Sequence, residues 1–574
     1  MTNKRNRMLT FALLLAAALC FRVIVARFLP NDEPGDGKIY AQMARNVLEQ
    51  HVYSHATEPP YDPSLIRLPG YPLFLAGIYA IFGHGDNTAV RIAQALIDTA
   101  SCALIALLAF YWEPDEKLKR RSAIAALALA AACPFSTIYV ATILTETPTI
   151  FCAVAMCLTA TFAFRELDQK RAALWWLATG IISGVAVLFR PDSGLFAAAI
   201  GITLVATTLK GSPQSQQPRP ARNFLLNFSR ASFLGAVFSL AFCLVLVPWT
   251  IRNHRVFHLF QPLAPAHAEM PGEFVPRGYL AWLRTWIDDG RYIGPVLWAL
   301  DDAPIKVSDI PERAFDSPEE KQRVVALFDK YNHPPDAQAP EEGSAQSSPS
   351  PADNQAEEQD ESSRNKNDNS NDNSNDNEEA DSGNQNDEDN SNSNDEADEN
   401  DQSDDNEAPG QATDQAVEMT PDIDAGFAQI AAERTRRHPI RSYLFLPFKR
   451  GLSLWFDTHS QYYPFEGELL PLGDLDYDIH QQYWLPLFAG LTFLYTLLGV
   501  AGGWFLWSSG LFSARRWLLL AALMIFLRIG FFATLENPEP RYVVEVFPFL
   551  SALGGIALVR LAGRKSSRKS LSSN

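Results

Sequence analysis

Apolar residues occupy most of the chain and gather in long runs that short polar stretches separate. A helix that crosses the hydrocarbon core of a bilayer needs about 20 mainly apolar residues. Ten runs approach or meet that length: 8–29, 88–112, 122–143, 146–164, 173–189, 193–209, 231–250, 483–507, 517–535 and 543–562. The pattern predicts an all-α polytopic membrane protein with about ten transmembrane helices. Segment 70–83 is too short to cross, and we expect an interfacial or re-entrant helix there.

Lys and Arg are concentrated in alternate polar segments. With ten spans these segments all fall on one side: residues 4–7, 113–121, 165–171, 210–230, 515–516 and 564–569. Because positive loops remain in the cytoplasm, we expect a multi-pass protein of the plasma (inner) membrane with both termini cytoplasmic. We interpret run 8–29 as an uncleaved span, since its small-residue motif at 16–18 lies inside the run rather than after it.

This orientation divides the chain into membrane modules and outer loops. The expected parts are an N-terminal membrane module 1–252 with a first outer loop 30–87, an outer loop 253–340, an insert 341–420, a second loop part 421–482, and a C-terminal membrane module with a basic tail, 483–574.

The net charge of −18 over 574 residues comes from the insert. Residues 341–420 hold 26 Asp and Glu, 2 Lys and Arg, and no Phe, Trp or Tyr, so the remaining chain has a net charge of +6. Such a stretch cannot bury enough apolar area to offset its ordering entropy, and we expect disorder. A cation-buffering or wall-binding tether is the alternative. The scattered basic residues outside the insert argue against a nucleic-acid partner.

The first outer loop contains candidate catalytic carboxylates just beyond the first span, among them Asp32 and Asp36. Tyr40, Ala44 and Leu48 follow Asp36 at helical spacing, which predicts a helix that begins at Asp36. An alternative is that Asp36 only caps this helix.

Further polar residues lie at the outer ends of spans, where burying them is costly unless they have a purpose. Arg67 and Tyr71 belong to the segment RLPGYPLF, which also suits a simple turn into the 70–83 helix. Glu146 begins the fourth span, where it would bond a sugar hydroxyl or an arginine, or serve only as a helix-end residue.

Three arginines at outer span ends run against the positive-inside trend: Arg190 in LFRPD, Arg252 beside Asn253 in PWTIRNH, and Arg541 in EPRY. Guanidinium groups hold phosphate in bidentate geometry, so we expect a phosphate-binding cavity on this side. For any single arginine, snorkelling to lipid headgroups is the alternative.

These segments together resemble the GT-C glycosyltransferases, in particular the family-39-like branch that includes protein O-mannosyltransferases and the lipid A aminoarabinose transferase. The matching pieces are DGKIYAQMARN from Asp36, RLPGYP from Arg67, Thr145-Glu146, GVAVLFRP from Gly184, PWTIRN from Pro248 and EPRY from Glu539.

The resemblance implies transfer of a sugar from a polyprenyl-phosphate donor to a lipid, glycan or protein acceptor on the outer face. Asp36 would be the general base and Arg190, Arg252 and Arg541 would bind the donor phosphate. The expected substrate-binding residues are Tyr40, Arg67, Tyr71, Glu146, Asn253 and Tyr542.

The chain departs from this family in its first loop. Protein mannosyltransferases carry an Asp-Glu pair there, whereas Gly37 follows Asp36 and the pair occurs earlier at 32–33, so Asp32 is the alternative base. No cofactor is required. A divalent metal held by Asp32, Asp36 and His51 is compatible with these residue types, but no spacing demands it.

Segment 434–455 mixes basic and aromatic residues, which predicts an amphipathic anchor with its basic residues near lipid headgroups. Two other functions remain open. A transporter or flippase of lipid-linked sugars would carry ionisable residues near the bilayer midplane and in repeated halves. An envelope scaffold would leave the outer arginines without a purpose.

Overall fold

The computed structural model describes residues 2–29, 35–166, 169–209, 220–288, 290–334, 417–465, 467 and 479–571. Regular structure within these ranges is helical, with no strand. The predicted all-α membrane fold is confirmed. Asp32, and the predicted insert apart from its last four residues, lie outside the described residues.

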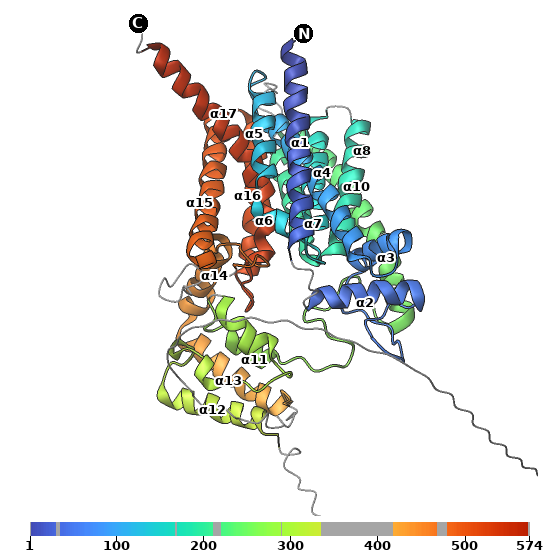
Figure 1. Ribbon diagram of the computed structural model, residues 1–574, viewed down its shortest axis with the longest axis vertical. Helices are drawn as coiled ribbons and strands as arrows, with labels where there is room; N and C mark the ends of the chain where they lie inside the picture. Colours follow the sequence, from blue (N-terminus) through green and yellow to red (C-terminus); the bar gives the residue numbers. More distant parts are fainter. Residues whose placement is uncertain are drawn as a thin grey trace, which may run out of the picture. The chain divides into compact units, whose positions relative to one another are not determined.

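Eight of the ten predicted spans coincide with helices that are long and apolar enough to cross a membrane (Figure 1). They are α1 (Thr2–Phe28), α4 (Asn87–Trp112), α7 (Glu146–Arg165), α8 (Gln169–Phe189), α9 (Gly194–Leu209) with the short helix η2 (Pro191–Ser193), α10 (Pro220–Phe257), α15 (Ile479–Ser508), and α17 (Phe547–Leu571) with η10 (Pro540–Val546).

The other two predicted spans have a different form. The run 122–143 is broken into α5 (Lys119–Ala131), α6 (Pro134–Thr137) and η1 (Ile138–Val140), with a bend of 52°. Helix α16 (Phe512–Phe532) packs within the bundle but carries three arginines. By length and composition the described residues therefore contain eight spans, or nine with the bent pair, and the count of ten is not confirmed.

Arg22 donates hydrogen bonds to backbone carbonyls that the break in the helix leaves inside the bundle. Pro134 has no N–H, and the carbonyls of Ala130 and Ala131 at the break accept hydrogen bonds from Arg22 at 3.1 and 3.2 Å. The fully buried guanidinium also pairs with Asp98 at 2.6 Å. Because lipid supplies no hydrogen bonds, these contacts allow the helix to break inside the bundle.

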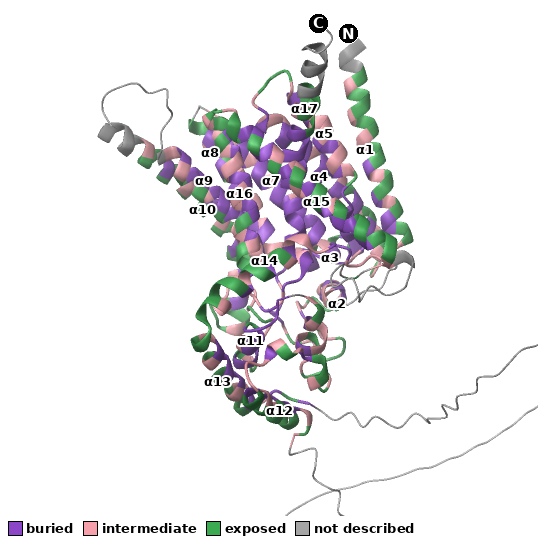
Figure 2. Ribbon diagram, turned by 90° about the vertical axis from the view of Figure 1, so that its left-hand side faces the viewer, coloured by how far each residue is buried: buried purple, intermediate pink, exposed green. Residues whose placement is uncertain are grey.

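Burial separates the centre of the bundle from its margin (Figure 2). In the apolar parts of α7 and α17, 72% and 83% of residues are buried, against 17% in α1. Glu146 begins α7, and Arg541 lies in η10 directly before α17, so both belong to the most buried part of the bundle.

The first outer loop forms two short helices, α2 (Asp36–Glu49) and α3 (Gly70–Phe82). Helix α2 lies across the direction of the membrane helices (Figure 1). The predicted stripe Tyr40, Ala44 and Leu48 packs against α3 in a small apolar core, which confirms the expected face of α2.

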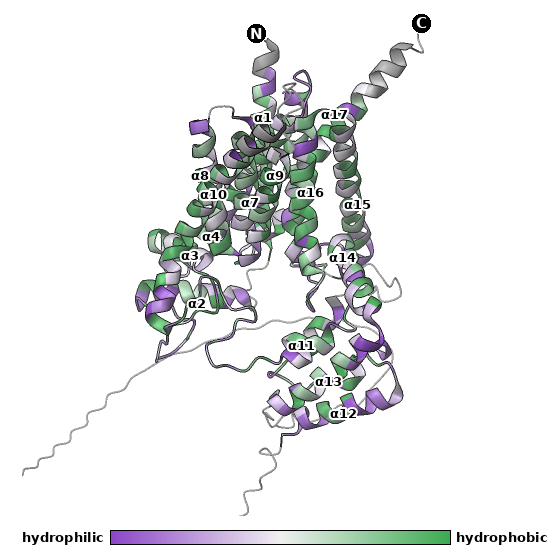
Figure 3. Cartoon of the chain, turned by 180° about the vertical axis from the view of Figure 1, so that it is seen from behind, coloured by the Kyte–Doolittle hydropathy of each residue, from purple (hydrophilic) through white to green (hydrophobic). Residues whose placement is uncertain are grey.

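Residues between α10 and α15 build a small helical head on the same side as α2. It contains α11 (Arg277–Leu283), η3 (Gly290–Tyr292), η4 (Gly294–Trp298), η5 (Val307–Asp309), η6 (Glu312–Ala314), α12 (Pro318–Asn332) and α13 (Pro421–Arg437). Tyr279, Trp282, Phe328 and Phe427 meet ring to ring in its core. Figure 3 shows that hydrophilic residues predominate along α12. The ion pair of Arg284 with Glu536 (2.6 Å) joins it to the bundle.

The predicted amphipathic segment forms η8 (Arg441–Phe445) and α14 (Leu446–Phe456). Ile440, Leu444 and Phe448 are 74%, 69% and 63% exposed at helical spacing, as a membrane-facing stripe requires. The prediction is wrong for two of its basic residues. Arg434 is buried against Glu320, and buried Arg450 donates to the carbonyl of Ile287 at 2.7 Å, so neither reaches lipid headgroups.

Candidate active site

A cavity of about 830 Å³ lies at the end of the bundle away from the chain termini, between the membrane helices, the first outer loop and the head. It is lined by most of the predicted site residues, namely Asp36, Tyr40, Arg67, Glu146, Arg190, Arg541 and Tyr542. Apolar side chains of α16 and the following turn, including Phe531, Phe532 and Leu535, form another part of its wall. The cavity therefore joins a charged region to an apolar one.

Asp36 lies between two guanidinium groups. Its Oδ1 accepts a hydrogen bond from Arg67 Nη2 at 2.7 Å, and its Oδ2 lies 3.6 Å from Arg541 Nη2. Burial opposes ionisation, but Arg67 and Arg541 together lower the pKa of Asp36 below its ordinary value. The carboxylate is thus charged at neutral pH and faces the cavity, which a simple helix cap would not require.

Tyr40, one helical turn after Asp36, cannot compete as a base. Burial and the neighbouring Asp36 carboxylate raise the pKa of Tyr40 to about 12, so its hydroxyl keeps its proton at neutral pH. The Tyr40 ring packs edge-on against Tyr71, with ring centroids 5.2 Å apart. Buried Tyr71 does not line the cavity; its hydroxyl donates to Gln94 at 3.0 Å, so it supports Tyr40 from behind.

Arg190 is surrounded by carboxylates. Its Nη1 lies 2.8 Å from Glu146 and 3.4 Å from Glu545, and its Nε lies 3.3 Å from Asp192. Arg528, a charged residue within α16, pairs with Asp192 (2.7 Å) and Glu545 (2.8 Å). Three carboxylates thus surround two guanidinium groups, and the Arg190 side chain, 11% exposed, is not at a lipid surface.

The segment RLPGYP places Arg67 by close packing. A Cβ on Gly70 would lie 2.5 Å from the carbonyl oxygen of Leu188, so only glycine allows α3 to begin against the end of α8. The same contact brings Arg67, before α3, and Arg190, after α8, to one cavity.

Arg252 and Asn253 lie outside the cavity wall. Arg252 donates to the carbonyls of Ser64 (2.8 Å) and Tyr53 (3.3 Å), and its guanidinium stacks near the ring of Trp249. Asn253 donates to the carbonyl of Gln261 at 2.8 Å. Because Arg252 holds the loop that leads to Arg67, the PWTIRN segment positions the site. The structure does not bring Arg252 together with the other phosphate candidates.

Several polar residues of the cavity were not among the sequence predictions: Asp192, Arg284, Glu536 and Asn537 in the wall, and Tyr462, Arg528, Glu539 and Glu545 behind it. One signal was available, because Arg528 interrupts an apolar span and an ionisable residue inside a membrane is functional by default. Glu536, Asn537 and Glu539 lie in a short polar turn, and its composition does not distinguish it from an ordinary loop.

The described residues contain no group of three His, Cys, Asp or Glu side chains arranged to hold a metal ion. Asp32, one of the three residues considered for a metal, lies outside the described residues, so that arrangement is not tested.

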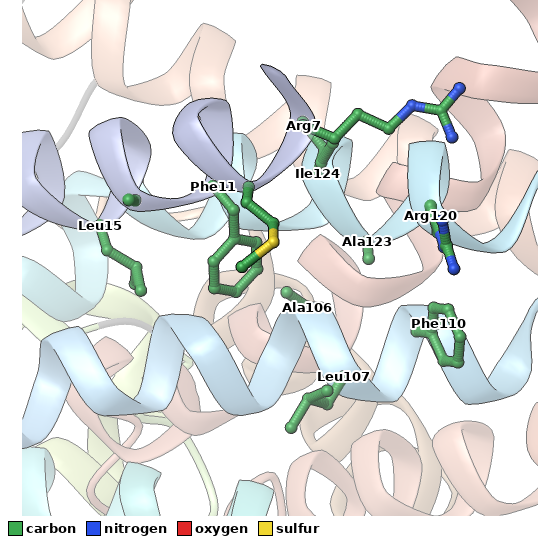
Figure 4. A pocket seen from close by; sticks show the side chains of 11 residues that line it. Arg7, Phe11, Leu15, Ala106, Leu107, Phe110, Arg120, Ala123 and Ile124 are labelled. Atoms are coloured by element: carbon green, nitrogen blue, oxygen red, sulfur yellow. The ribbon is translucent and has the colours of Figure 1, made fainter. Parts of the chain in front are cut away.

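A second cavity, of about 490 Å³, lies between α1, α4 and α5 (Figure 4). Phe11, Leu15 and Leu107 are among its apolar lining, and Arg7 and Arg120 lie at one end. None of its lining residues is a carboxylate, so it offers no general base and is not the candidate active site.

Comparisons with known proteins agree with the motif-based resemblance. Residues 62–219 match the family model described as dolichyl-phosphate-mannose-protein mannosyltransferase, which confirms the expected likeness to family-39-like GT-C glycosyltransferases and supports a membrane glycosyltransferase. The matched range contains Arg67, Glu146 and Arg190 but ends short of Asp36 and Arg541 on either side. The search of curated proteins finds no match.

Two solved structures are similar to the chain at low identity. The oligosaccharyltransferase of Archaeoglobus fulgidus shares 12% identity with a TM-score of 0.40, covering 96% of this chain and 51% of its own. ArnT from Cupriavidus metallidurans, bound to undecaprenyl phosphate, shares 13% identity with a TM-score of 0.32, covering 96% of this chain and 78% of its own. The chain thus spans about half the length of the archaeal enzyme.

Proposed function

We propose that the protein transfers a sugar from a polyprenyl-phosphate donor to a hydroxyl group of an acceptor on the outer face of the plasma membrane. The observation that carries this proposal is the placement of the ionised Asp36 carboxylate at the cavity wall between Arg67 and Arg541. The family match supports the donor class, since a dolichyl phosphate sugar is a polyprenyl-phosphate donor. Acceptors of lipid, glycan and protein type all fit this proposal.

Asp36 acts as general base in this mechanism. It removes the proton of the acceptor hydroxyl while that oxygen attacks the anomeric carbon of the sugar. The bond between this carbon and the phosphate oxygen breaks, and its electron pair leaves with the lipid phosphate. Arg67 and Arg541 stabilise the charge that develops on the phosphate, and the proton remains on Asp36. The step requires no cofactor.

Donor binding and base strength are coupled by the same two arginines. Arg67 and Arg541 pair with Asp36 in the structure and lower its pKa. A donor phosphate competes for these guanidinium groups, because planar forks bind phosphate in bidentate geometry. As the arginines turn to the phosphate, the pKa of Asp36 rises and the carboxylate becomes a stronger base when the donor is present.

The assignment of the phosphate to Arg67 and Arg541 differs from the expectation for Arg190 and Arg252. Arg190 already pairs with three carboxylates, and the N–H groups of Arg252 donate hydrogen bonds to backbone carbonyls, so neither side chain is placed to bind the donor phosphate. Arg541 keeps a partner in Glu539 at 2.5 Å, so it can share its charge with a phosphate without losing its position. The apolar wall that includes Phe531 and Leu535 suits the isoprenoid chain.

Turnover in proteoliposomes tests the proposal. Labelled polyprenyl phosphosugars and a membrane extract as acceptor source should give labelled product together with free polyprenyl phosphate, and a chelator should not change the rate. A transporter would instead move the intact donor across the bilayer and would release no free polyprenyl phosphate. That result would refute the proposal.

A further inference from the structure

Glu146 lines the cavity, and one of its two carboxylate oxygens is buried without a hydrogen bond. The residue is 2% exposed, and its Oε1 accepts from Arg190 at 2.8 Å. Its Oε2 is buried and no donor from the described residues reaches it. Burying an acceptor without a hydrogen bond is costly, so such an atom on a residue that lines a cavity points to a ligand.

Asn537 lines the same cavity and has a second buried oxygen without a hydrogen bond. Its Nδ2 donates to Glu539 Oε1 at 2.7 Å and to the hydroxyl of Tyr542 at 3.1 Å. Because a carboxylate only accepts, these bonds fix the orientation of the amide. The Oδ1 atom is therefore directed away from Glu539, and no donor from the described part of the chain reaches it.

The two oxygens are held in rigid positions. Glu146 is fixed by Arg190, whose guanidinium lies 5.4 Å from the ring centre of Tyr542. Tyr542 in turn accepts the bond from Asn537 and donates to Glu539 at 2.7 Å. The neighbouring residue, Arg541, contacts Asp36, so this part of the wall is continuous with the proposed base and phosphate site.

A wall of acceptors selects a ligand that carries donors. A phosphate has only acceptor oxygens at neutral pH, and an isoprenoid chain has neither donors nor acceptors. The hydroxyl groups of the sugar are the donor-bearing part of the proposed substrate. Resting on the proposed function, we infer that Glu146 Oε2 and Asn537 Oδ1 bind hydroxyl groups of the donor's sugar and determine which sugar the protein accepts.

Competition binding in nanodiscs tests this inference without an acceptor, so only the donor's own sugar can contribute. The competitors of labelled undecaprenyl phosphate are the bare lipid and the same lipid phosphate carrying mannose, glucose, N-acetylglucosamine or 4-amino-4-deoxyarabinose. In the unmodified protein at least one sugar should raise the affinity about tenfold over the bare lipid, as one strong hydrogen bond allows.

Glu146→Gln should reduce that gain to within about twofold of the bare lipid, because the Gln oxygen must continue to accept from Arg190 and its NH₂ group then faces the sugar. Asn537→Ala should reduce the gain in affinity in part, and this variant alone tests the inference if Glu146→Gln fails to fold. Glu113→Gln is the matched control. Glu113 is 1% exposed and paired with Arg560, and it lies outside the cavity, so its variant should keep the gain.

The outcomes separate the two proposals. If bare undecaprenyl phosphate does not bind the unmodified protein, the proposed function fails. If it binds but no sugar raises the affinity, or if Glu146→Gln and Asn537→Ala both keep the full gain at an unchanged melting temperature, the sugar-recognition inference is overturned and the proposed function stands.

Discussion

Replacement of Asp36 by Asn removes the proposed base while keeping the shape of the side chain. General-base catalysis contributes about 10²–10⁴-fold in rate, so the transfer rate should fall by that factor, equivalent to about 3–5 kcal/mol of barrier. Some activity should remain, because Arg67 and Arg541 still stabilise the leaving phosphate.

The structure indicates that this variant folds. The amide oxygen of Asn can still accept from Arg67, whose side chain is 23% exposed, and Arg541 keeps its ion pair with Glu539. A partly exposed ion pair contributes at most about 1 kcal/mol, so the melting temperature should change little.

Single-turnover release of polyprenyl phosphate measures the effect most directly. The loss should appear in kcat, while binding of bare undecaprenyl phosphate should be unchanged or tighter, since a neutral Asn competes less strongly than a carboxylate for Arg67. Turnover within about threefold of the unmodified protein, at an unchanged melting temperature, would remove Asp36 from the mechanism.

Three further changes have expected outcomes. Arg67→Met removes a group that lowers the pKa of Asp36 while burial still raises it, so the acid limb of kcat/KM against pH should move to higher pH; an unmoved limb would mean that another group titrates there. Arg22→Leu leaves Asp98 unpaired in the bundle and should cost about 3–5 kcal/mol of stability by thermal unfolding. Replacing Asp98 by Leu as well should restore only part of this loss, because the carbonyls of Ala130 and Ala131 still lack the donors of Arg22. Replacing 341–416 by a short Gly-Ser linker should leave melting temperature and transfer unchanged, and loss of folding would show that this segment contributes to the structure; Val417 and Met419 must stay because they pack in the head core.

The candidate site could be predicted in part because its motifs lie at span ends. Asp36, Arg190 and Arg541 stand beside long apolar runs, and such residues gather at one end of a bundle whatever the order of its helices. Asn537 gave no such signal. It lies in a polar turn, and only its bonds to Glu539 and Tyr542 distinguish it from an ordinary loop residue.

The sequence by itself determined that this is a membrane protein of apolar helices, with charged and polar residues at the ends of its spans. That is a local property, since each segment in lipid must satisfy its own backbone and be apolar along its length. Only the tertiary structure decided which arginines serve the cavity. Arg252 and Arg541 look alike in sequence. Arg252, however, donates its hydrogen bonds to the carbonyls of Tyr53 and Ser64, whereas Arg541, near the other end of the chain, pairs with Asp36. Direction and partner of a side chain depend on packing between distant segments, which no local pattern records.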